Sequence, residues 1–137
     1  MLLDLKKFER LLAEGQRRHD ELAKGLAPLQ ADYEKAGAAV AELQREQADL
    51  KQRLAAADRG QLNLSEAEIA AAGDRVRWLQ GAIERANIKR SEALKVLKAA
   101  ENTARGAMQP LKTEAINAWL DEFNAADREY IAAWKRL

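Results

Sequence analysis

The sequence contains no cysteine and only one histidine, His19. Without cysteine, the chain has no disulfide bonds, no thiolate metal ligands and no cysteine nucleophile. A single histidine is too few for a zinc site of the usual composition within one chain. We therefore expect a protein with no metal site and no cofactor.

Proline and aromatic residues are also scarce: the only prolines are Pro28 and Pro110, and aromatic residues make up 5% of the chain. Inside a helix, proline removes a backbone hydrogen bond and clashes with the preceding turn, so its scarcity permits long helices. β-Branched residues are few, alanine and leucine dominate the apolar residues, and 33% of all residues are charged. This composition is typical of long helices and predicts an all-α protein.

Long apolar runs are missing as well. No stretch approaches the roughly 18 uncharged apolar residues that a membrane-spanning helix needs. Asp4 lies where a signal peptide would need an uninterrupted apolar core. We therefore expect a soluble, cytoplasmic protein that makes no membrane contact.

No catalytic pattern is visible. The seven glycines are scattered and form no phosphate-binding loop. Most carboxylates lie on helix faces opposite the apolar positions, whereas acid–base catalysis needs carboxylates that converge in a desolvated place. For His19 we favour a packing role over a pH-sensitive contact or catalysis. We expect a protein that is not an enzyme.

What the sequence does contain is a heptad repeat over its first 57 residues. Position a falls on Leu5, Leu12, His19, Leu26, Tyr33, Val40, Gln47 and Leu54, and position d on Phe8, Gly15, Leu22, Leu29, Ala36, Leu43, Leu50 and Ala57. Of these, only His19, Gly15 and Gln47 are poor core residues. A period of 3.5 residues held over eight heptads predicts a helix over 1–57 that supercoils against another helix.

Gly25 and Pro28 disturb this helix chemically, yet the register passes through them unchanged from Leu22 to Leu26 to Leu29. A turn would usually reset the phase of the repeat. The pattern therefore favours a kink near Gly25–Pro28. A corner there would instead divide the protein into four helical segments rather than three.

Turn chemistry without periodicity predicts a loop over 58–64. Ser65 and Glu68 form the pattern of a capping box, in which each side chain accepts a hydrogen bond from the other residue's amide, so a second helix is expected over 65–105. Gly106 is a typical helix stop. Pro110 suits the first turn of a third helix over 110–136.

These segments predict one helical domain spanning 1–137. A short connection between two long helices favours a long antiparallel helical hairpin, a coiled coil, on which the third C-terminal helix packs to give an elongated bundle. Such a slender fold leaves much of the outer flank of the repeat uncovered. We therefore expect a homo-oligomer, most simply a twofold dimer.

Four of the seven aromatic residues lie within the last nineteen positions, and their spacings of four, seven and four place them on one broad helical face. They are Trp119, Phe123, Tyr130 and Trp134. One interpretation is a bundle core where the third helix docks on the hairpin. The other is a partner-binding patch, because tryptophan and tyrosine bury a large area at interfaces with little entropy lost.

Basic residues are concentrated in the second half of the chain. Residues 75–105 include eight basic residues and only three glutamates, although the whole chain has a net charge of only +1. The outward-facing members of this set are Arg77, Arg85, Lys95, Lys98 and Arg105. Arg90 instead falls on the apolar seam, the row of inward-facing positions where two helices of the hairpin meet. A row of cations on an outer face is either a solvated surface, a contact for an acidic protein, or a site that follows nucleic-acid phosphates.

These features predict a non-enzymatic coiled-coil interaction module: an assembly factor, an adaptor, or an inhibitor of a larger complex. The alanine- and arginine-rich composition also fits a small bacterial or phage component. The alternative is a nucleic-acid-binding accessory protein that uses the basic outer face of residues 75–105.

Overall fold

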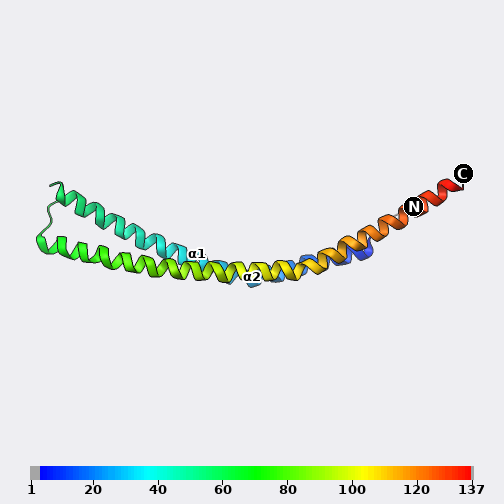
Figure 1. The fold of residues 1–137 in the computed structure, drawn as a ribbon, viewed down its shortest axis with the longest axis horizontal. Helices are drawn as coiled ribbons and strands as arrows, with labels where there is room; N and C mark the ends of the chain where they lie inside the picture. The colour runs from blue at the N-terminus through cyan, green and yellow to red at the C-terminus, as the bar shows by residue number, and fades with distance from the viewer. Residues whose placement is uncertain (1–3, 137) are drawn as a thin grey trace. The chain divides into compact units, whose positions relative to one another are not determined.

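The computed structural model describes residues 4–136, which form two long helices. Helix α1 spans Lys6–Asp58 and helix α2 spans Glu66–Lys135, and the described residues contain no strand. The two helices pack against each other as a hairpin (Figure 1). The prediction of an all-α protein built on a helical hairpin is confirmed.

The link between the helices begins with a glycine that ends α1. Gly60 has a φ of +72°, a left-handed conformation that residues with a Cβ atom rarely adopt. The amide of Gly60 donates to the carbonyl of Ala57, and the amide of Gln61 donates to that of Ala56. Both bonds satisfy carbonyl groups in the last turn of α1, the pattern of a Schellman motif.

Ser65 starts the second helix. Its Oγ accepts a hydrogen bond from the backbone amide of Glu68 at 3.2 Å. This bond satisfies one of the amides that the first turn of any helix leaves without a partner. The Ser65 half of the predicted capping box is therefore confirmed.

Neither proline ends a helix. Pro28 lies inside α1 and Pro110 lies inside α2. The predicted stop at Gly106 and the separate third helix over 110–136 are therefore wrong, because the helix predicted over 65–105 continues to Lys135. The residues on both sides of Pro110 explain this continuity: Ala104, Met108, Leu111 and Ala115 all turn away from solvent, and their packing outweighs the cost of about 3 kcal/mol for an interior proline.

Contacts divide the chain into two units, each of which pairs a part of α1 with a part of α2. Unit 1 combines Met1–Ala27 with Ala99–Leu137, and unit 2 comprises Pro28–Lys98.

Unit 2 has the better-buried interior. Leu79 is completely buried, and Val40, Ala82, Ile83 and Leu97 are buried with it. In this part of α1, every predicted a and d position from Leu29 to Ala57 is buried or half-buried. The heptad pattern therefore identifies the inward face of α1 in unit 2 correctly.

The pairing in unit 2 is antiparallel, as its side-chain contacts show. Glu46 of α1 pairs with Arg75 of α2 at 2.8 Å, whereas Tyr33, earlier in α1, accepts a hydrogen bond from Arg90, later in α2. Arg90, predicted on the seam, has an exposed side chain that lies over the Tyr33 ring at 5.5 Å, beside Gly37.

Unit 1 has a buried row of its own on α2. From α2, the buried residues are Leu111, Ala115 and Ala118. Gly15 of α1 lies against Leu111, since a Cβ at Gly15 would be 3.4 Å from the Leu111 Cδ2 atom. Two predicted seam residues of α1, Leu12 and His19, are exposed here, and Leu11 is less exposed than Leu12.

Candidate protein-docking surface

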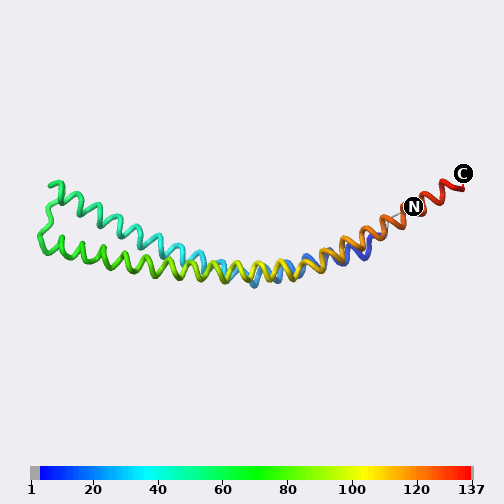
Figure 2. The backbone as a smooth tube through the Cα atoms, in the orientation of Figure 1, coloured from blue at the N-terminus to red at the C-terminus, as the bar shows by residue number. Residues whose placement is uncertain are grey.

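The described part of α1 covers only part of α2 within unit 1. Gly15 lies opposite Met108 and Leu111. The two helices of the hairpin run in opposite directions with the same rise per residue. Counting from Gly15, Lys6 at the start of α1 therefore lies at the level of about residue 120 of α2. Beyond that level α2 continues to Lys135, past the blue start of α1 (Figure 2). The last turns of α2 therefore have no described α1 segment beside them.

This end of α2 carries an exposed row of large apolar side chains, which we call the C-terminal apolar face. Its seven members are Ile116, Trp119, Leu120, Phe123, Tyr130, Ile131 and Trp134. Their exposed fractions run from 39% for Trp119 to 61% for Trp134. The four aromatic members of this face were named in the sequence analysis, whereas Ile116, Leu120 and Ile131 were not singled out.

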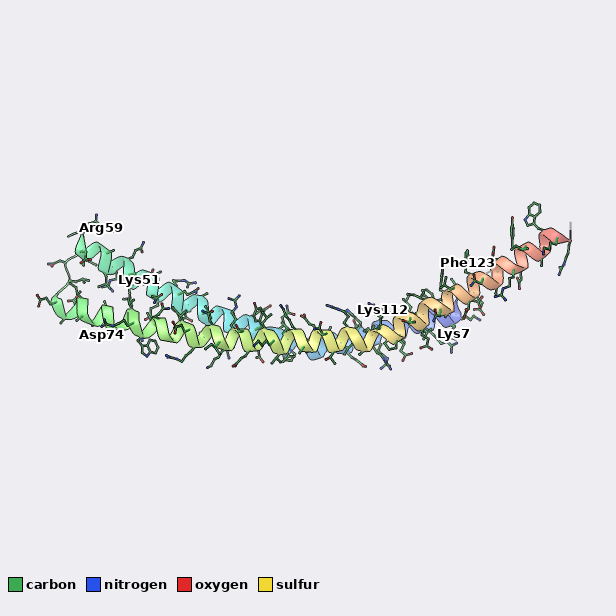
Figure 3. All side chains as sticks on the ribbon, viewed as in Figure 1. Lys7, Lys51, Arg59, Asp74, Lys112 and Phe123 are labelled. Atoms are coloured by element: carbon green, nitrogen blue, oxygen red, sulfur yellow. The ribbon has the colours of Figure 1, made fainter. Side chains whose placement is uncertain are left out.

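The aromatic members form two pairs, each one helical turn apart. The rings of Trp119 and Phe123 stack, with centroids 5.5 Å apart and planes inclined by 12° (Figure 3 labels Phe123 on α2). The rings of Tyr130 and Trp134 meet edge to face at 6.2 Å. Such pairs hold the rings in defined orientations and lower the entropy that a binding partner would have to remove.

The face does not point at α1. With 3.6 residues per turn, the four aromatic residues lie roughly a third of a turn from the buried row of Leu111, Ala115 and Ala118. The interpretation of these aromatics as the core between a third helix and the hairpin is therefore wrong. The interpretation as a partner-binding patch stays a prediction.

An open apolar groove of unit 1 adjoins this face. It is lined by residues of both helices, including Leu11, Leu12, Gly15, Met108, Lys112 and Ala115. Met108, Lys112, Ala115 and Trp119 follow one another at spacings of four, three and four, so they form one row along α2. The groove thus continues onto the C-terminal apolar face, and the exposed side chain of Leu12 extends the apolar surface onto α1.

The predicted basic residues are exposed, and they are divided between the two units. Arg77, Arg85, Lys95 and Lys98 belong to unit 2, whereas Arg105 belongs to unit 1. Arg77 pairs with Asp74 one turn earlier in α2, which offsets its charge. Glu84 and Glu92 interrupt the row further.

Unit 2 has exposed apolar residues of its own on α2. Trp78, Ile88 and Val96 are each more than half exposed. These three residues and the basic residues Arg85, Lys89 and Lys95 are spaced by roughly whole helical turns, so they lie along one side of α2 within unit 2. We call these six residues the basic apolar face.

Arg75 holds the start of this face in place. Its guanidinium donates two hydrogen bonds to the Glu46 carboxylate, at 2.8 and 3.2 Å, and lies 4.3 Å from the centre of the Trp78 ring. The hydrogen bonds from Arg75 to Glu46 raise the pKa of Arg75. Trp78 is therefore oriented by a cation that α1 in turn anchors.

Within residues 4–136, no group of three or more His, Asp or Glu side chains is arranged to hold a metal ion. His19 is exposed and lies 3.8 Å from the Asp20 carboxylate. Neither described helix is both long and apolar enough to cross a membrane.

No protein-family model, no curated protein and no solved structure matches this chain.

Proposed function

We propose that this chain is a non-enzymatic interaction protein whose C-terminal apolar face binds another protein. The observation that carries the proposal is the row of seven large, exposed apolar side chains on one side of α2. Exposed apolar residues are ordinary when scattered, but a contiguous row of them marks a surface that another molecule covers.

Energetics support a protein contact at this face. Full burial of a large apolar side chain contributes about 1.5–3 kcal/mol, so covering the exposed half of each contributes about 1 kcal/mol. Seven such residues on one helix therefore contribute about 7 kcal/mol, against an association cost of about 4–15 kcal/mol that polar contacts of the interface would also help to offset. The residues expected to contribute most are Trp119, Phe123, Tyr130 and Trp134, since tryptophan and tyrosine predominate at interface hot spots.

The hairpin acts as the scaffold for this face. The inward positions of α1 follow the heptad repeat through unit 2, which supports coiled-coil packing between α1 and α2. A long hairpin that presents a helical end to a partner suits an assembly factor, an adaptor or an inhibitor of a larger complex, including a bacterial or phage assembly.

A photo-crosslinking residue tests the proposal at a defined position. We expect a crosslinker in place of Asn124, beside Phe123, to trap a protein partner in cells of the native source. The same crosslinker in place of Asn102, also exposed on α2 but away from the face, serves as the control. Mass spectrometry of the trapped complex identifies the partner.

A double variant then decides whether the aromatic rings make the contact. Phe123→Ala with Trp134→Ala should reduce crosslinking from position 124 at least tenfold, with helicity by circular dichroism largely kept. A matched variant, Leu62→Ala with Ile69→Ala, removes exposed apolar bulk elsewhere and should have no effect. Unchanged crosslinking in the aromatic double variant would refute the proposal.

A second candidate function, nucleic-acid binding by unit 2, is favoured by the exposed side chains of Arg85, Lys95 and Lys98 on one helix. Phosphate contacts of this kind weaken steeply between about 0.05 and 0.2 M salt. A gel-shift assay with duplex and single-stranded DNA and RNA at both salt concentrations is the test. Absence of binding at the lower concentration would rule it out.

A further inference from the structure

Two opposite charges lie in line with the C-terminal apolar face. At about 100° per residue, Lys112 and Asp127 fall within about 40° of the middle of the face, and both side chains are exposed. The other charged residues between 112 and 134 lie more than about 100° from the middle of the face. These are Glu114, Asp121, Glu122, Arg128 and Glu129. The face therefore has one cation just before its start and one anion in its later half.

The positions along this side of α2 are symmetric about a point midway between Trp119 and Leu120. Going outward from this midpoint, residues on one side have counterparts at the same distance on the other. The matched pairs are Ile116 with Phe123, Lys112 with Asp127, Met108 with Ile131, and Arg105 with Trp134. If two α2 helices pack antiparallel about this midpoint, the two members of each pair lie at the same level, one on each copy.

The matched positions are chemically complementary. Lys112 of one copy lies level with Asp127 of the other, and a twofold pair forms this ion pair twice. Arg105 lies level with Trp134, which places a cation beside an indole ring. The remaining matched pairs join apolar side chains. Such self-complementarity is what a contact between two identical copies related by a twofold axis requires.

The start of α1 falls at the same midpoint, since Lys6 lies at the level of about residue 120 of α2. In the antiparallel arrangement, the uncovered end of α2 in one copy, about residues 121–135, lies level with about residues 104–118 of the other. There α1 and α2 are paired, and the apolar groove lined by Leu12, Met108 and Ala115 opens between them. The uncovered end of each copy thus lies along the groove of the other.

We propose that the occupant of the C-terminal apolar face is the same face of a second copy of this chain, in an antiparallel twofold pair centred between Trp119 and Leu120. The proposal rests on the proposed function and names the occupant of that surface. One association covers both apolar rows, whose half-exposed side chains together bury on the order of 1,000 Å², the lower limit for a specific interface. A twofold contact is closed, so a pair adds no further copies.

Exchange of the two charges provides the decisive experiment. Lys112→Asp and Asp127→Lys each turn both ion pairs of the dimer into pairs of like charge. The matched controls are Arg128→Asp and Asp121→Lys, which make the same reversals at exposed positions of α2 away from the face. Sedimentation velocity measures the mass of the full chain over a range of concentrations, and circular dichroism verifies folding.

We expect the unmodified chain to form a dimer and no larger species. Each single variant should dimerise at least tenfold more weakly, whereas the two controls should dimerise like the unmodified chain. An equimolar mixture of the two single variants should restore the dimer, because one copy then has only acidic and the other only basic residues at the two positions. The variant with both exchanges should dimerise by itself for the same reason.

A chain that stays monomeric at every concentration overturns the inference. So does a dimer that both single variants form as readily as the unmodified chain, because a parallel pair or another register does not bring Lys112 to Asp127. A mixture of the single variants that fails to restore the dimer overturns it as well. A monomeric chain that still crosslinks to a different protein from position 124 refutes this inference alone, and a monomeric chain with no crosslink also refutes the proposed function.

Discussion

Individual glycines have opposite roles in this chain. Gly60 holds a left-handed conformation at the end of α1, where a Cβ atom causes strain. Gly106 lies within α2 with open space where its Cβ would be. In the middle of a helix, glycine lacks a side chain that would restrict the unfolded state, so it lowers helix stability relative to alanine.

Alanine substitution should therefore have opposite effects at the two positions. We expect Gly60→Ala to lower the free energy of unfolding by about 1–2 kcal/mol, because an L-residue in the left-handed region costs about that much. Gly106→Ala should raise it by about 1 kcal/mol. Urea denaturation followed by circular dichroism measures both changes. A destabilising Gly106→Ala would mean that the glycine serves a close contact or a helix stop.

Residue-level reasoning also explains why Leu12 is exposed. The heptad places Leu12 on the seam, but Gly15, one turn later, allows Leu111 to approach the backbone of α1 closely. Leu11 turns inward in place of Leu12 as a result. The repeat gives the average direction of the seam, whereas the size of the opposing side chain determines which of two adjacent leucines lies in it.

Among the elements, α2 is the one whose length the sequence did not reveal. Gly106 and Pro110 are typical of a helix end followed by a helix start. Both residues are nevertheless helical, since Met108, Leu111 and Ala115 line unit 1 at helical spacing around them. Packing against α1 thus overrides two local signals for a break.

Pro110→Ala tests this explanation. If α2 carries an interior proline at an energetic cost, the substitution restores a backbone hydrogen bond and should raise the free energy of unfolding by about 2–3 kcal/mol. Thermal and urea unfolding measure the change. A neutral or destabilising effect would indicate that a helix start at Pro110 is energetically preferred, contrary to the continuous α2.

For the whole molecule, the end of α2 contributes surface rather than core. The large side chains from Trp119 to Trp134 remain exposed, whereas the buried residues of unit 1 end at Ala118. The two roles of α2, packing against α1 and presenting apolar side chains, are therefore assigned to different stretches of one helix.

Truncation after Asn124 should separate these roles. We expect the shortened chain to keep its thermal midpoint within a few degrees, because the removed residues bury little apolar surface and surface changes rarely exceed about 0.5 kcal/mol each. It should bind the partner of the C-terminal apolar face at least tenfold more weakly, because Tyr130, Ile131 and Trp134 are removed. Thermal unfolding and the crosslinking assay measure the two effects, and a fall of more than about 10 °C in the midpoint would show that the removed segment supports the hairpin.

The sequence by itself determined the helical class, the cap at Ser65 and the inward face of α1 in unit 2. Each of these follows from side-chain periodicity or from hydrogen bonds between residues close in the chain. Local interactions of this kind do not depend on which other segment lies alongside.

Only the tertiary structure decided that α2 continues through Pro110 and which of its sides is buried. Both sides of its last third are apolar: one has small residues such as Ala115 and Ala118, and the other has large ones such as Trp119 and Phe123. Size suggested that the large residues form the core. The small ones pack against α1 instead, and periodicity along one helix carries no information on which side its neighbour takes or how near that neighbour lies.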